Sequence, residues 1–293
     1  FEQVVKTYPD EQAIIRNSEK GIAECLFKIG DAKAAVEKFN SIIKTHPDSS
    51  IAQESMIWLG NYYMETADFP TAAHKFEEFL SRYPNSEKIN EAHYQLGKIY
   101  ENRREFEKAL NQYKSVNAPE EDELYAKAKL AIADIFSREL DSQTAIQTYE
   151  NIISRSPDFK RDAFVKIADV YKGQQEYQKA VETYQRALSA EQKSSQAGDP
   201  ELQFQIADVC ELAGQNDKAL EEYLKIPYLY PDEKAWVIKA NLRAARIFED
   251  GERWEDAKNI YKKIVELNIE ESAFANERLE WLNENTEQQH KTN

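Results

Sequence analysis

The sequence predicts an all-α protein built as a solenoid of helical hairpins. Three observations predict this fold class: a pattern of small and aromatic residues that recurs at a near-constant period, apolar residues at helical spacing inside each copy, and a Pro that follows most copies. No stretch alternates apolar and polar residues for long enough to indicate a strand. A fixed period of this length is typical of stacked helical pairs.

The recurring pattern is a small residue, an Ala twelve positions later, and an aromatic residue four positions after that Ala. Consecutive copies lie 35 to 39 residues apart. The copies are Ala23/Ala35/Phe39, Gly60/Ala72/Phe76, Gly97/Ala109/Tyr113, Ala133/Ala145/Tyr149, Ala168/Ala180/Tyr184, Ala207/Ala219/Tyr223 and Ala245/Ala257/Tyr261.

The third copy shows how each unit divides into two helices. Apolar spacing predicts a first helix over residues 89–103 and a second over residues 106–116, joined by a short polar turn. Gly97 and Ala109 are small enough to let the two helix axes approach closely. We expect the aromatic ring of Tyr113 to fill the gap to the next unit.

Proline ends most of the second helices, because it cannot continue a helix interior and biases the preceding residue away from helix. An Asp or Asn usually follows it, which suits a turn or the approach to the next N-cap. These prolines are Pro9, Pro47, Pro84, Pro119, Pro157 and Pro231.

The order Leu59-Gly60-x-x-Tyr63, then Ala72 and Phe76, then Pro84, resembles the tetratricopeptide repeat, and the match covers about residues 1–270. The resemblance implies a right-handed α-α superhelical solenoid whose first helices line a concave face. Units of this length look most like the long repeat proteins of bacterial cell envelopes. Cys210 and Ala244 depart from the family pattern.

We expect one solenoid over residues 1–284, with a partial repeat at 1–10, seven repeats within about 16–269 and a capping helix at about 271–284. Residues 285–293 are polar, and we expect a disordered tail. The chain starts with what corresponds to a second helix, which suggests a piece of a longer protein. Residues 190–199 read as a lengthened loop, after which Asp199 and Pro200 start a helix.

Composition narrows the range of partners and activities. The chain has 53 acidic and 38 basic residues and a net charge of −15, which argues against binding to nucleic acid or to an anionic membrane surface. We also expect no direct membrane insertion of this segment. Its four His show no metal-ligand spacing, and no Gly-rich phosphate loop appears. Cys25 and Cys210 lie five repeats apart and read as small core residues. We therefore expect no enzymatic activity, no cofactor and no metal.

The resemblance places the candidate binding groove on the first helices. One row lies three residues before each small residue, and a second row lies one residue after it. Four residues separate the two rows, so they share a helix face. The apolar row is Ile57, Tyr94, Leu130, Val165, Phe204 and Leu242; the polar row is Asn61, Lys98, Asp134, Asp169, Asp208 and Arg246. The three consecutive Asp residues favour a basic partner segment. The alternative is that the Asp row is solvated surface and the apolar row packs partly inside the solenoid.

Three functions stay open at this point. The first is a protein-interaction scaffold that holds a protein or peptide in the groove. The second is a structural solenoid that assembles with further copies of itself, and the third is the regulatory or targeting arm of an enzyme whose catalytic domain lies outside the chain. The sub-family resemblance favours the bacterial periplasm or cell envelope, with the cytoplasm as the alternative.

Overall fold

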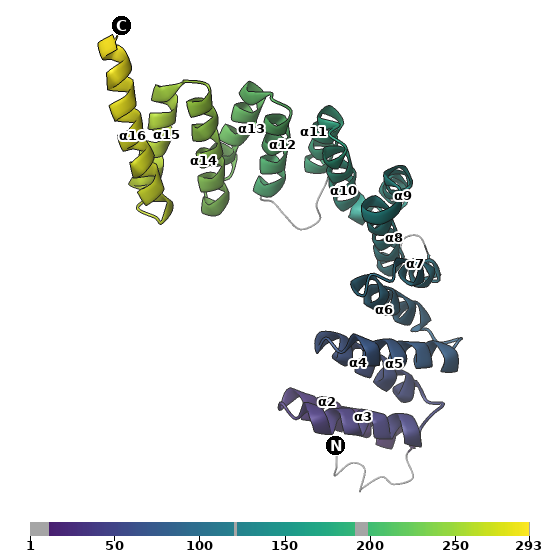
Figure 1. The fold of residues 1–293 in the computed structure, drawn as a ribbon. Helices are drawn as coiled ribbons and strands as arrows, with labels where there is room; N and C mark the ends of the chain where they lie inside the picture. Colours follow the sequence, from purple (N-terminus) through teal and green to yellow (C-terminus); the bar gives the residue numbers. More distant parts are fainter. Residues whose placement is uncertain (1–11, 120–121, 191–198, 293) are drawn as a thin grey trace. The chain divides into compact units, whose positions relative to one another are not determined.

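The computed structural model describes residues 12–119, 122–190 and 199–292. Throughout these residues the secondary structure is helical, without a strand, and the helices pack as antiparallel pairs (Figure 1). The predicted all-α solenoid of helical hairpins is therefore confirmed. The partial repeat expected at 1–10 and most of the expected loop at 190–199 lie outside the described residues. Two compact units, residues 1–148 and 149–293, are described separately below.

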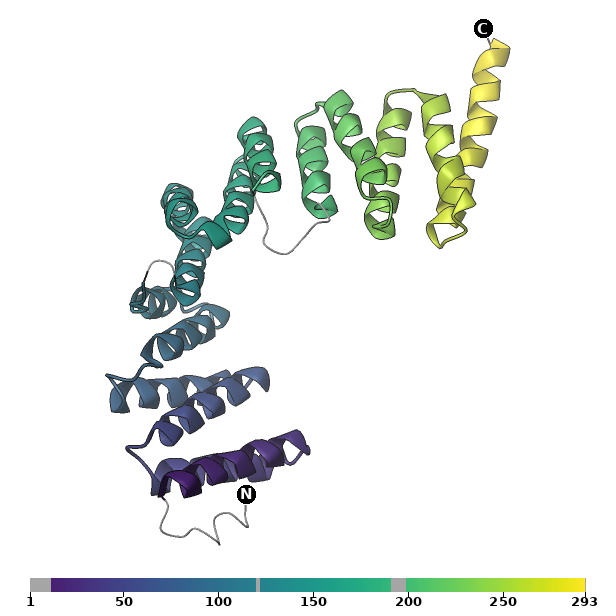
Figure 2. The same cartoon turned by 180° about the vertical axis from the view of Figure 1, so that it is seen from behind.

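The first unit consists of three complete hairpins and the first helix of a fourth. Figure 2 shows these hairpins from behind. Their helices are α2 (Gln12–Lys28), α3 (Ala32–Thr45), α4 (Ser50–Glu65), α5 (Phe69–Arg82), α6 (Ile89–Asn102), α7 (Phe106–Lys114) and α8 (Glu123–Ile135), which continues into a π-helical turn at Phe136–Leu140. Helix α9 (Ser142–Arg155) crosses the boundary between the two units.

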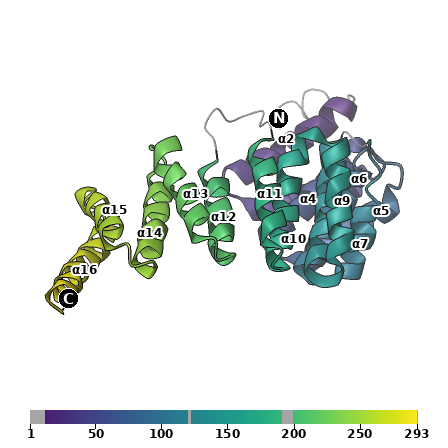
Figure 3. The same ribbon diagram turned by 90° about the horizontal axis from the view of Figure 1, so that it is seen from above.

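The second unit continues the same alternation of first and second helices, seen from above in Figure 3. After a 3-10 turn at Pro157–Phe159 come α10 (Lys160–Gly173), α11 (Tyr177–Leu188), α12 (Pro200–Leu212), α13 (Asn216–Leu229), α14 (Lys234–Asp250), α15 (Trp254–Glu266) and α16 (Glu271–Thr292).

Each helix packs mainly against the helices before and after it in the chain. First helices of consecutive hairpins also touch one another, as α2 does with α4, α6 with α8, and α12 with α14. Within each unit the first helices therefore lie side by side on one face. We call this surface the first-helix face: α2, α4, α6 and α8 in the first unit, and α10, α12 and α14 in the second.

The small residue of each first helix lies directly beneath the aromatic ring of the same hairpin. A Cβ added to Gly97 would lie 2.6 Å from the Tyr113 ring, and one added to Gly60 would lie 2.6 Å from the Phe76 ring. Both rings are fully buried. The Tyr113 ring thus closes its own hairpin, a contact that the sequence pattern did not predict.

The hairpin turns share one backbone feature that the sequence pattern does not reveal. The seventh residue after the small residue is left-handed in six hairpins, at Gly30, Ala67, Arg104, Gln175, Gly214 and Glu252. The next N–H then bonds back across the helix end, as from Glu105 N to Tyr100 O at 2.8 Å. This geometry satisfies the last carbonyls of a helix and reverses the chain. In the fourth hairpin the π-helical turn takes its place.

Side-chain caps fix several helix starts. Asp31, Ser49 and Asp68 accept hydrogen bonds from the backbone N–H three residues further on. Asp199 does the same with Leu202 N at 2.8 Å, and Pro200 follows as the first helical residue, as predicted. An N-cap of this kind contributes about 1 kcal/mol.

The last helix extends further than the sequence predicts. Helix α16 reaches Thr292 rather than ending near residue 284. Leu282 is fully buried and Leu279 packs on the core, whereas Phe274 stays 51% exposed, so it covers the preceding helix only in part. Arg278 of this helix pairs with Glu249 on α14.

The two cysteines differ in burial. Cys210 is buried, as expected, but Cys25 is exposed. From the third hairpin on, the equivalent position, two residues after the small residue, is buried, for example Ile99 and Val209. In the second hairpin it is the half-buried Tyr62.

We expect Gly97→Ala to destabilise the protein by about 1–3 kcal/mol, because the new methyl group would overlap the buried Tyr113 ring. Gly173→Ala is the matched control, since a Cβ there meets nothing within 4 Å. That change should be neutral or stabilising by up to about 1 kcal/mol through helix propensity. Chemical denaturation of both variants measures the difference, and equal midpoints would contradict the packing described.

Candidate functional site

The apolar row of the predicted groove is partly used for packing inside the hairpins. Ile57 is buried, while Tyr94, Leu130, Val165, Phe204 and Leu242 are half-buried. The Phe204 ring lies 5.1 Å from the Tyr223 ring and 5.5 Å from the Trp236 ring. The Tyr94 ring lies 5.7 Å from the Tyr113 ring. Tyr94 and Phe204 therefore pack against neighbouring rings, and the half-buried members of the row stay partly accessible.

The polar row is largely compensated by neighbouring side chains. Asp208 pairs with Lys172 at 2.7 Å and lies 3.6 Å from Arg243. Asp169 accepts a hydrogen bond from the Tyr184 hydroxyl. Asp134 is half-buried and belongs to the first unit, whereas Asp169 and Asp208 belong to the second. The Asp residues thus do not form a row of uncompensated charge.

Two cations complete the polar row. Lys98 is exposed on α6, and its ammonium lies 5.9 Å from the centre of the Tyr94 ring. Arg246 is exposed on α14. The structure therefore brings Tyr94 and Lys98 together with Leu130 and Asp134 in the first unit, where α6 contacts α8. In the second unit it brings Val165, Asp169, Phe204, Asp208, Leu242 and Arg246 onto α10, α12 and α14.

A second polar pattern is correlated with the type of aromatic residue on each second helix. Where that residue is Phe, the residue twelve positions earlier is apolar: Phe27 for Phe39, and Met64 for Phe76. Where it is Tyr, the residue twelve positions earlier is polar: Glu101, Ser137, Lys172, Glu211 and Glu249. The sequence contains this correlation, although the pattern of small and aromatic residues alone does not show it.

The hydrogen bonds explain the correlation. Tyr113 donates its hydroxyl to Glu101 at 2.8 Å, and Tyr223 donates to Glu211 at 3.0 Å. Burial and the neighbouring carboxylate raise the pKa of Tyr113 above its usual value, so the hydroxyl keeps its proton. Tyr184 has Lys172 in the equivalent place and bonds to Asp169 instead. Each of these buried hydroxyls therefore has a hydrogen-bond acceptor, as buried donors in native proteins generally do.

The same carboxylates reach the next hairpin. Glu101 pairs with Arg138, Glu211 with Arg243 at 3.0 Å, and Glu249 with Arg278. We call this contact, from the end of one first helix to the next hairpin, the step contact. Between α10 and α12 it consists of Lys172 with Gln205 at 3.3 Å and with Asp208. Each polar step contact ties two consecutive hairpins together.

The first step contact is aromatic rather than polar. The Phe27 ring at the end of α2 meets the Trp58 ring edge-on at 5.1 Å and the Tyr62 ring at 6.0 Å. Trp58 stacks on the buried Phe39 at 4.1 Å and on Tyr62 at 5.3 Å. The rows of the predicted groove omit these residues. The signal that could have found them is the Phe at position 27, where most later repeats carry a polar residue.

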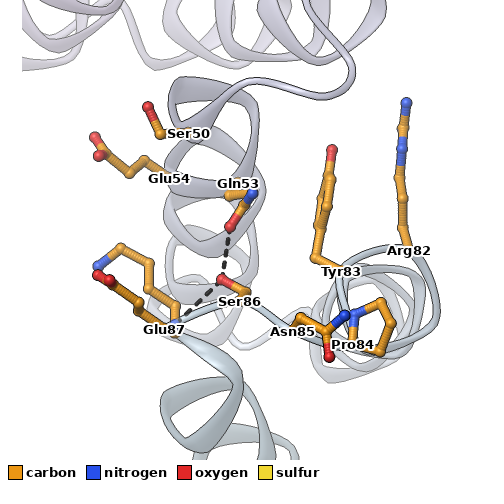
Figure 4. Close-up of a pocket in the computed structure, with 10 residues that line it drawn as sticks. Ser50, Gln53, Glu54, Arg82, Tyr83, Pro84, Asn85, Ser86 and Glu87 are labelled. Atoms are coloured by element: carbon orange, nitrogen blue, oxygen red, sulfur yellow. Dashed lines mark hydrogen bonds between the residues drawn. The ribbon is translucent and has the colours of Figure 1, made fainter.

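A polar cleft of about 450 Å³ lies where the α5–α6 turn meets the start of α4 (Figure 4). Tyr83 donates its hydroxyl to Pro47 O at 2.5 Å, and Ser86 donates to Gln53 at 2.6 Å. The first bond joins two successive inter-hairpin turns, and the second joins the α5–α6 turn to the first turn of α4. The packing of the α5–α6 turn against α4 therefore accounts for the cleft.

A smaller cleft of about 350 Å³ lies between α9, α10 and α11 in the second unit, with Phe164 and Ile167 on its floor. Arg186 stacks over Phe164 at 4.3 Å. Glu150, Lys179 and Glu182 also line it, so both signs of charge are present.

Across the part of the chain that the structure describes, no three His, Cys, Asp or Glu side chains lie close enough to hold a metal ion. Among those same residues, no helix combines the length and the apolar character that crossing a bilayer requires.

We expect Tyr113→Phe to cost about 1 kcal/mol, because Glu101 loses a hydrogen-bond donor in a largely buried setting. Adding Glu101→Met recreates the Phe76 and Met64 pair of the second hairpin, and we expect it to restore part of that loss. Denaturant midpoints of the two single variants and the double variant measure the coupling. Strictly additive effects would show that the two side chains do not interact.

Comparison with known families gives two matches. Residues 22–189, more than half of the chain, match the family model YfiO, described as outer membrane lipoprotein. Residues 165–234 match a tetratricopeptide repeat model. No curated protein sequence matches significantly.

Solved structures support the fold. A tetratricopeptide repeat protein from Parabacteroides merdae is 16% identical with a TM-score of 0.57, and the match covers 91% of this chain and 98% of that one. The C-terminal part of a repeat protein from Cytophaga hutchinsonii is 19% identical with a TM-score of 0.66, covering 87% and 98%.

PilW, a widely conserved type IV pilus biogenesis factor, is 17% identical with a TM-score of 0.53, covering 74% of this chain and 94% of PilW. At such identities these likenesses show the fold alone. Together with the family match, the stacked hairpins and their small–aromatic contacts establish that the chain belongs to the outer membrane lipoprotein (YfiO) family and that its hairpins are tetratricopeptide repeats.

Proposed function

We propose that the protein is a non-enzymatic interaction scaffold that binds a segment of a partner protein along its first-helix face. One observation carries the proposal: half-buried apolar side chains alternate there with exposed charges. In the second unit, Val165, Phe204 and Leu242 lie on the same face as Asp169 and Arg246. A surface of this kind suits a peptide that carries apolar anchors beside charged residues.

The apolar and charged residues would contribute to binding in different ways. Phe204 packs against the Tyr223 and Trp236 rings. Little conformational entropy of the Phe204 side chain is therefore lost when a partner covers it. Exposed charges act over about 8–10 Å at physiological salt and mainly change the association rate. We therefore expect the apolar row to set the dissociation rate.

The ion pairs bear on the partner's charge. Because Asp208 already pairs with Lys172 and lies close to Arg243, a basic segment would compete with these contacts. Asp169 is exposed, so this carboxylate supports a preference for basic segments better than the half-buried Asp208 does. Reversing Asp208 to Lys would also place three cations together, so it is a poor test of binding.

The family description supports a site of action in the bacterial cell envelope. Self-assembly of the solenoid and a role as the regulatory arm of a larger protein remain the alternatives. Photo-cross-linking distinguishes these alternatives from the proposal. Self-assembly gives a cross-link between two copies of the chain, and a regulatory arm gives a cross-link within a longer chain.

Photo-cross-linking in the native organism tests the proposal directly, because it captures any protein that touches the chosen position. A photoreactive amino acid replaces Lys98 or Arg246, both exposed on the first-helix face, or Tyr228, which is 84% exposed on α13. We expect discrete protein adducts from the first two positions and fewer from Tyr228. Adducts from Tyr228 alone would move the binding surface to the second helices, and adducts of twice the chain's mass would support self-assembly.

Phe204→Ala, made in the Arg246 cross-linker background, tests the apolar row. Removing the ring should reduce the adduct about tenfold, as expected for an aromatic anchor worth more than 1 kcal/mol. Tyr228→Ala is the matched control, because that ring is 84% exposed on α13, a second helix outside the first-helix face. Equal adduct yields from both variants would show that Phe204 does not contact the partner.

A further inference from the structure

The aromatic cluster of the first step contact is rigid and partly open to solvent. Its stack begins in the core, where Phe39 is buried, continues through Trp58 at 4.1 Å, and ends at the half-buried Tyr62 a further 5.3 Å away. Phe27 stands edge-on to the last two rings and is 38% exposed. Ile29, two residues beyond Phe27, is 77% exposed. The chain thus exposes aromatic side chains that pack, through Trp58, against the buried ring of Phe39.

Later hairpins show that packing does not require this aromatic surface. At equivalent step contacts the second unit uses Lys172 with Gln205 and Glu211 with Arg243. These polar pairs join consecutive hairpins and leave a polar surface. Phe27 and Trp58 take the same places in the first unit, where they expose apolar area to water. An exposed aromatic group where a polar pair would serve is typical of a contact surface for another molecule.

Carboxylates surround the rings. Glu24 lies one turn before Phe27 on α2, and Glu54 and Glu65 flank Trp58 and Tyr62 on α4. Glu24 and Glu54 share a single cation, Lys20, which lies 3.7 Å from Glu24 and also pairs with Glu54. Glu65 is exposed, and no ion pair to it is found within the described chain. Lys28 follows Phe27 but projects about 100° away around the helix.

Ring faces beside carboxylates are the environment that Arg and Lys side chains prefer, because the cation meets both the aromatic quadrupole and an opposite charge. We propose that the aromatic face formed by Phe27, Trp58 and Tyr62 docks a partner segment in which Arg or Lys alternates with apolar side chains. This inference rests on the proposed scaffold function and names the partner chemistry for the N-terminal hairpins.

The test uses the full chain and a short fluorescein-labelled peptide of alternating Arg and Leu, with binding followed by fluorescence anisotropy at about 0.15 M salt. The double variant Phe27→Leu with Tyr62→Leu removes two ring faces and keeps apolar bulk, and we expect it to bind about tenfold more weakly. Phe27→Tyr keeps the ring and should bind as wild type. Tyr228→Leu, which removes the most exposed aromatic ring of the second unit, should also be unchanged.

A second peptide, with Glu in place of Arg, should not bind detectably. The proposal is overturned if the double variant binds the Arg peptide as tightly as wild type, if Tyr228→Leu loses as much affinity, or if wild type binds neither peptide. Circular dichroism melting of the double variant checks the fold, and Phe27→Tyr separates loss of the ring from loss of structure.

The proposed function can fail separately. If Phe204→Ala weakens the Arg peptide and the double variant does not, the peptide binds the second unit, so the aromatic face is excluded while the scaffold stands. Cross-linking from Lys98 and Arg246 judges the scaffold without any peptide.

Discussion

The contact between a small residue on each first helix and an aromatic ring on the second determines how each hairpin closes. At Gly60 and Gly97 there is no room for even a methyl group, since the ring lies 2.6 Å from where a Cβ would be. Ala occupies the equivalent position in the other hairpins and is fully buried in each of them. Because every hairpin places a buried small residue opposite an aromatic ring, consecutive hairpins present similar surfaces to one another and can stack.

That contact also decides where polar groups are needed. A Tyr at the ring position brings a hydroxyl into the core, and this hydroxyl needs a hydrogen-bond acceptor. Glu101 and Glu211, each twelve residues earlier in the chain, supply one. The acceptor then reaches Arg138 or Arg243 in the next hairpin. A Phe at the ring position requires no acceptor, and the place is free for Phe27 or Met64. The presence or absence of the Tyr hydroxyl thus determines whether the step contact is polar or apolar.

Much of the fold could be predicted because it depends on spacing alone. The predicted helices at 89–103 and 106–116 differ from α6 and α7 by no more than two residues at either end. The neutralisation of Asp208 could not be predicted in the same way, because it depends on Lys172 and Arg243 reaching across from neighbouring hairpins. The aromatic cluster was missed for a different reason. Consensus rows report what the repeats share, and Phe27 matters because it departs from them.

The side-by-side packing of first helices has a consequence for the partner's own sequence. Packed helices lie roughly 8–10 Å apart, and a chain in the polyproline II conformation advances about 3.1 Å per residue with three residues per turn. Such a chain laid across the first helices of one unit would therefore meet the next helix about every third residue, with the same face. Residues of such a partner that touch the scaffold should recur with that period, and the two residues between them should be free to vary. The spacing of the hairpins would thus set the register in which the partner binds.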